Sequence, residues 1–143
     1  MKNQESLLPL WLAWTGMSSA LVAAMAVPAL AGPKLPWWPD ARLEVFTYPI
    51  ALFAMVCGVG SLALRERLVR TVSSGTLDPH STEGAGRVRS SLVRAWALCV
   101  AVAILGSFIA WVAAEPRRAW PYGLGAMALL VFHAPRPVVP RPS

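Results

Sequence analysis

Four side chains with nucleophilic potential lie in apolar segments: Cys57, Cys99, Ser61 and Ser107. None has a general base nearby in the sequence, and none belongs to an activating motif. Buried cysteines usually behave as small apolar residues, and two cysteines at this spacing indicate neither a disulfide framework nor a metal site. We therefore expect no enzyme activity, no cofactor and no bound metal.

Other chemical signatures are equally weak. His80 and His133 do not form a haem-binding pair, and we expect His133 to bond a carbonyl or a lipid headgroup. Gly58-Val59-Gly60 lies inside an apolar segment, and Gly84-Ala85-Gly86 follows no predicted strand, so neither indicates a phosphate loop. No Asp, Glu, Lys, Arg or His lies near the middle of an apolar segment, which argues against ion translocation.

The elements that carry these residues are predicted to be membrane helices. Of 143 residues, 56% are hydrophobic and only 14% are charged, whereas a soluble domain has about 25% charged residues. A helix needs roughly 20 apolar residues to cross a membrane. The sequence predicts an all-α integral membrane protein with four transmembrane helices in a single domain. We place them at residues 7–31, 45–72, 88–114 and 119–134, with a Pro-rich extended tail at 135–143. The last helix is short, and we favour a thin span over a partly inserted helix.

The first apolar segment allows a second interpretation. Ala29-Leu30-Ala31 resembles the small-residue cleavage site of a signal peptide. A signal core usually has about 7–15 apolar residues, and this segment is longer, so we expect the helix to be retained. Pro28 is expected to kink or end it.

Positive charge dominates, at +6 overall. Because no nucleic-acid-binding motif is present, we expect arginines to contact anionic headgroups and to set topology. With a cytoplasmic N-terminus, nine Lys and Arg residues fall inside and four outside. This favours both termini in the cytoplasm of a bacterial inner membrane. The headgroup contacts are assigned to a basic cytoplasmic loop, residues 65–94, through Arg65, Arg67, Arg70, Arg87, Arg89 and Arg94.

Tryptophan prefers the headgroup level of a membrane. We place six tryptophans there: Trp11, Trp14, Trp37, Trp38, Trp111 and Trp120. The linker at residues 32–44 contains Trp37, Trp38 and three prolines, which indicate a stiff extended segment. We expect it to rest in the interface, and docking of a partner is the alternative.

The second and third helices are predicted to form a close-packed hairpin. Helices in lipid associate through small residues that allow close backbone approach. Such residues share one face of each helix: Ala54, Gly58 and Ser61 on the second, and Ala95, Cys99, Ala103 and Ser107 on the third. An antiparallel hairpin would set Ser61 beside Ala95, Gly58 beside Cys99 and Ala54 beside Ala103.

A family resemblance covers Ala51 to Ala113. The run Ala85-Gly86-Arg87-Val88-Arg89-Ser90-Ser91, followed by an apolar helix containing Gly106, resembles the loop and second helix of the proteolipid c subunit of rotary ATP synthases. That family's ion-binding carboxylate would fall near Val100, and a valine side chain cannot bind an ion. The resemblance therefore implies a hairpin that associates laterally without translocating ions.

These patterns favour a non-catalytic accessory, scaffold or assembly subunit of a larger membrane complex. Its expected partners are membrane lipids and other membrane subunits or further copies of itself, with no nucleic acid. A proteolipid-like homo-oligomer and a small-solute or lipid transporter with an apolar path are the alternatives.

Overall fold

The computed structural model describes residues 8–31, 40–79, 81–113 and 115–135, and these are almost entirely helical. The elements are α2 (Leu8–Ala31), α3 (Asp40–Ser73), α4 (Thr82–Val112), the 3-10 helix η1 (Pro116–Ala119) and α5 (Trp120–Phe132). The all-α fold class is confirmed. Among the described residues, α2, α3 and α4 are long and apolar enough to cross a membrane, whereas α5 has only 13 residues.

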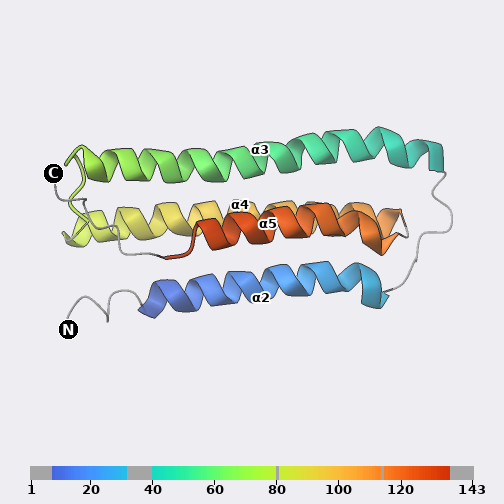
Figure 1. Cartoon of the computed structure of the whole chain (residues 1–143), viewed down its shortest axis with the longest axis horizontal. Coiled ribbons are helices and arrows are strands. Elements are labelled where there is room, and N and C mark those ends of the chain that lie inside the picture. The colour runs from blue at the N-terminus through green and yellow to red at the C-terminus, as the bar shows by residue number, and fades with distance from the viewer. Residues whose placement is uncertain (1–7, 32–39, 80, 114, 136–143) are drawn as a thin grey trace.

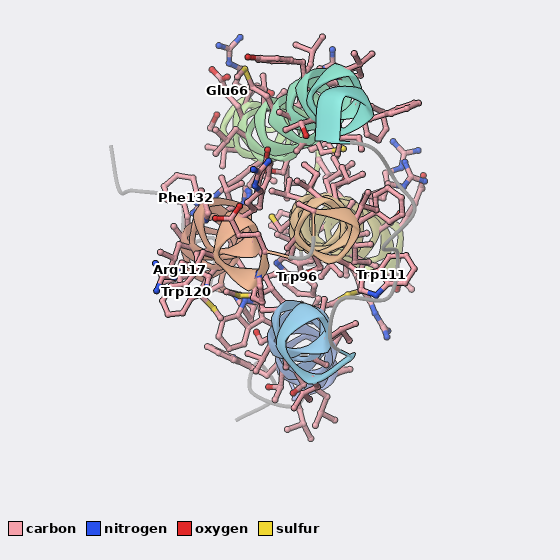
Figure 2. The ribbon with its side chains drawn as sticks, turned by 90° about the vertical axis from the view of Figure 1, so that its right-hand side faces the viewer. Glu66, Trp96, Trp111, Arg117, Trp120 and Phe132 are labelled. Atoms are coloured by element: carbon pink, nitrogen blue, oxygen red, sulfur yellow. The ribbon has the colours of Figure 1, made fainter. Side chains whose placement is uncertain are left out.

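Successive helices run in opposite directions along one common axis (Figure 1). The beginning of α2, the turn between α3 and α4, and the end of α5 therefore point the same way. We call the end of the bundle that holds the connection at residues 74–81 the loop end. The opposite end, where η1 lies, is called the turn end. Seen along the axis, α4 lies in the middle with α3, α5 and α2 around it, while its remaining side faces no other helix (Figure 2).

Both helices of the hairpin begin earlier than the sequence predicted. α3 begins at Asp40 rather than 45, and α4 at Thr82 rather than 88. The reason at α4 is a cap: the Ser81 hydroxyl accepts a hydrogen bond from the Gly84 N–H at 3.0 Å, which satisfies one of the free donors of the first turn. Most of the predicted loop at residues 65–94 thus forms two helical arms, joined by a turn in which Gly75 has a φ of 71°.

At the other predicted break, Pro28 does not end the first helix, because α2 continues to Ala31.

The central helix, α4, buries the most residues. The buried set consists mainly of small and apolar residues: Gly84, Ala95, Trp96, Cys99, Val102, Ala103, Gly106, Ser107, Ile109 and Ala110. α4 is therefore the helix against which the other three pack.

The small residues assigned to the hairpin are largely buried, but two of them face other helices. Ala54, Ser61, Ala95, Cys99, Ala103 and Ser107 are buried. A Cβ atom at Gly58 would meet Leu129 of α5 at 3.6 Å and not Cys99, and the Ser107 hydroxyl donates to the Ala24 carbonyl of α2 at 2.6 Å. The prediction that Gly58 packs against Cys99 is wrong, because α5 covers Gly58, and Ser107, which was given no partner, bonds α2.

Two glycines permit the closest approaches of α5 to its neighbours. A Cβ atom at Gly106 of α4 would overlap with the Cβ atom of Tyr122 in α5. A Cβ atom at Gly123 of α5 would overlap with the side chain of Met25 in α2. Close backbone approach at glycine is a usual means of helix association in lipid, so Gly106 sets how near α5 lies to α4, while Gly123 leaves room for the Met25 side chain of α2.

We predict that Gly106→Ala lowers the thermal stability of the protein in mild detergent. The added methyl group overlaps with the Cβ atom of Tyr122, which cannot rotate away, and overpacking of this kind costs about 1–3 kcal/mol. Gly125→Ala is the matched control, because a Cβ atom at Gly125 meets nothing within 4 Å. Equal melting temperatures for the two variants would contradict the close contact between α4 and α5.

Candidate functional site at the carboxyl end of α5

The last helix ends at the edge of the apolar part of the bundle, because Gly106 of α4 lies against Tyr122 of α5 and the antiparallel register then places Phe132 level with Trp96, two residues from Arg94. Its 13 residues give it a length of roughly 20 Å, and the charge-free part of α4, from Ala95 to Val112, extends about 27 Å; η1 accounts for the difference at the turn end. Figure 1 shows α5 ending well before α4 begins at the loop end. A helix end leaves its last four carbonyls without partners, and an unsatisfied carbonyl in hydrocarbon costs several kcal/mol. The end of α5 therefore needs donors from elsewhere.

Two tryptophans provide such donors from two different helices. The indole N–H of Trp14 in α2 donates to the Leu130 carbonyl at 3.0 Å. The indole N–H of Trp96 in α4 donates to the His133 carbonyl at 2.9 Å. Trp96 is completely buried and points into the space between α4, α5 and α2 (Figure 2). Each ring thus combines a large apolar surface with one donor aimed at a helix end.

An arginine supplies the third donor, from α3. The guanidinium of Arg65 donates to the Phe132 carbonyl and lies over the Phe132 ring, 4.0 Å from its centroid. The ring attracts the cation through its quadrupole, so side chain and backbone of Phe132 hold the same group. We call Trp14, Arg65 and Trp96 together the carbonyl cap.

Backbone groups satisfy the remaining carbonyls. The Leu129 carbonyl accepts from the His133 N–H at 2.9 Å, and the Val131 carbonyl accepts from the Ala134 N–H at 3.2 Å. With the carbonyl cap in place, each carbonyl from Leu129 to His133 has a donor. A helix end at this depth is stable because every one of these bonds is made.

The side chain of His133 is buried at the same junction, with 1% of its surface exposed. Its Nε2 atom lies 3.3 Å from the Ser61 hydroxyl, and that hydroxyl donates to the Gly58 carbonyl at 2.7 Å. The Nδ1 atom has no partner among the described residues. The ring therefore bonds a serine, and the predicted bond to a carbonyl or headgroup is wrong.

The six arginines assigned to headgroups differ in their surroundings. Arg65 is half-buried and belongs to the carbonyl cap. Arg70 pairs with Glu66, and Arg87 with Glu83, each four residues away on the same helix; exposed pairs of this type contribute only about 0.3–0.5 kcal/mol. The other three are exposed and form no ion pair within the described part of the chain: Arg67, Arg89 and Arg94.

The tryptophans assigned to the interface also divide. Trp11 packs edge-on against Trp14 with centroids 5.5 Å apart. Trp111 is half-buried beside Phe108, and Trp120 is exposed. Trp37 and Trp38 lie outside the described residues.

Sequence reasoning missed Trp96, although a signal was present. Residues two positions apart in the sequence are separated by about 200° around a helix. Trp96 and the exposed Arg94 therefore lie on nearly opposite sides of α4. The burial of Trp96 follows from this offset once Arg94 is placed toward the headgroups. Its hydrogen bond to His133 does not follow, because the neighbouring helix must be known.

Comparison with protein-family models, with curated proteins and with solved structures gives no match. The geometry of the junction is therefore the basis for its interpretation. Among the described residues, no group of three or more His, Cys, Asp or Glu side chains could hold a metal ion. The polar side chains of the cap bond helix carbonyls, an arrangement that fixes helices relative to one another.

We predict that Trp96→Phe lowers the free energy of unfolding by about 1–3 kcal/mol, since it removes the donor and leaves the buried His133 carbonyl unsatisfied. Trp120→Phe is the matched control, because Trp120 is 61% exposed at the start of α5. Unfolding in mild detergent, followed by circular dichroism, measures the difference. A Trp96→Phe variant as stable as Trp120→Phe would show that the indole N–H contributes nothing at this site.

Proposed function

We propose that this protein is a non-catalytic scaffold or accessory subunit of a larger membrane complex. The observation that carries the proposal is the carbonyl cap. Polar side chains of α2, α3 and α4 are used to fix the end of α5, which makes the bundle one rigid unit. Such a unit is suited to hold other proteins in place.

The arms of α3 and α4 beyond Arg65 and Arg94 support a role in contact. Leu68 and Val72 are buried in this otherwise polar region, so the arms pack together. Residues 65–94 contain six arginines and three acidic residues, a net charge of +3 from the difference. A rigid basic projection at the loop end suits an acidic surface on a neighbouring subunit.

We also propose that η1 and α5 together form a fourth crossing. At about 2.0 Å per residue for a 3-10 helix and 1.5 Å for an α-helix, the two measure roughly 27 Å. They connect Arg117 and Arg118 at the turn end to the Arg65 contact toward the loop end, against a hydrocarbon thickness of about 30 Å. The excess of Lys and Arg toward the loop end favours the cytoplasm for that side.

Reporter fusions test this topology. A reporter inserted after Gly75 is expected to be active in the cytoplasm, and one inserted after Arg118 on the opposite side of the membrane, because basic residues are retained on the cytoplasmic side. An external reporter at Gly75 would overturn the orientation. Reporters at Gly75 and after Ala134 on opposite sides would overturn the fourth crossing.

Co-purification from native membranes in mild detergent tests the subunit role. The expected result is a stoichiometric complex with at least one different membrane protein. Replacing Arg67 and Arg89 with Gln should weaken that complex, because both are exposed on the arms. The matched control replaces Arg117 and Arg118 at the turn end.

Three results would contradict the proposal. A homo-oligomeric ring would favour the proteolipid-like interpretation. Solute uptake by the purified protein in liposomes would favour a transporter. Equal loss of the complex in both double variants would show that the arms are not the contact.

A further inference from the structure

One face of α4 meets no other helix of the bundle. Its residues recur every three or four positions, which places them on one side of a helix. In chain order they are Arg87, Ser90, Arg94, Ala97, Ala101, Ile104 and Phe108, all exposed except the half-buried Ala101. Trp111 continues the series, and Figure 2 shows it on the side of α4 away from α5. We call this set the open face.

The open face changes from polar to apolar at the level where α3 does. A Cβ atom at Gly60 of α3 would meet Leu98 of α4 at 3.5 Å. Because the two helices are antiparallel, one turn toward the loop end brings Leu64 level with Arg94. Arg65, the first charged residue after the apolar part of α3, therefore lies at nearly the same depth as Arg94. Arg94 thus marks the edge of the apolar layer.

We propose that the open face binds one phospholipid with an anionic headgroup. Arg94 is exposed and forms no ion pair within the described residues, and Ser90 presents a hydroxyl one turn farther out. Together they match a phosphate in charge and hydrogen bonding. Ala97 and Ala101 are small enough for an acyl chain to lie close to the backbone. Ile104 lies about 15 Å from Arg94 along the helix, half of a hydrocarbon core of about 30 Å.

The outward face of α3 explains why the charge matters. Leu52, Val59 and Leu62 form a comparable exposed apolar surface. Glu66, one turn beyond Leu62, points outward from the bundle at the corresponding edge (Figure 2), where it pairs with Arg70. The pair has no net charge, so the two faces offer the same apolar contact, but only the open face of α4 has an unpaired cation at its edge among the described residues. The open face of α4 is the one that selects an anionic lipid.

Native mass spectrometry with added phosphatidylglycerol or phosphatidylcholine tests the assignment. The wild-type protein is expected to retain one phosphatidylglycerol in preference to phosphatidylcholine. Arg94→Gln should weaken this retention about five-fold, the factor that corresponds to the ~1 kcal/mol expected for one arginine near a headgroup. Arg67→Gln is the matched control, since Arg67 is also exposed and unpaired among the described residues but belongs to α3.

Cross-linking with phosphatidylglycerol that carries a diazirine in its acyl chain provides a second measurement on the unmodified protein. Adducts are expected at residues 97–104 of α4 and not on the outward face of α3. Equal adducts on both faces, or equal loss of lipid in Arg94→Gln and Arg67→Gln, would overturn the site. Discovery of a polypeptide helix cross-linked to Ala97 or Ala101 in native membranes would also overturn it.

Discussion

A helix that ends within an apolar layer must have its last carbonyls bonded, because no water is present to bond them. In this protein α5 ends at the edge of that layer, close to the level marked by Arg65 and Arg94, and Trp14, Arg65 and Trp96 reach its end from three helices. Each donor fixes the distance of its own helix from α5. The relative positions of α2, α3 and α4 at this depth consequently depend on a single helix end.

Toward the turn end, the arrangement is held by a different means. Gly106 allows the backbones of α4 and α5 to approach closely, Gly123 makes room for the Met25 side chain of α2, and Ser107 bonds the Ala24 carbonyl of α2. α5 is thus held by close packing near one end and by hydrogen bonds at the other. With α3, α5 and α2 placed in this way, one face of α4 is left for another molecule, which we infer to be a lipid.

Hydropathy predicted the all-α class and the three long helices, because an apolar stretch of about 20 residues without charge is typical of a transmembrane helix. The spacing of small residues predicted which sides of α3 and α4 are buried. It did not predict the partners, since periodicity shows which face is covered but not which helix covers it. The contacts of Gly58 with α5 and of Ser107 with α2 are examples that periodicity alone could not predict. Arg65 looked like a headgroup ligand because its charge is evident in the sequence, whereas the reach of its side chain to Phe132 is not.

Solid-state NMR of the protein in lipid bilayers tests the carbonyl cap most directly. The chain has only two histidines, so labelling histidine carbonyls with carbon-13 and tryptophan indoles with nitrogen-15 leaves few possible pairs. The 2.9 Å separation between Trp96 Nε1 and the His133 carbonyl oxygen predicts a strong correlation that disappears in Trp96→Phe and persists in Trp120→Phe. Absence of the correlation in the wild-type protein, or its survival in Trp96→Phe, would contradict the cap.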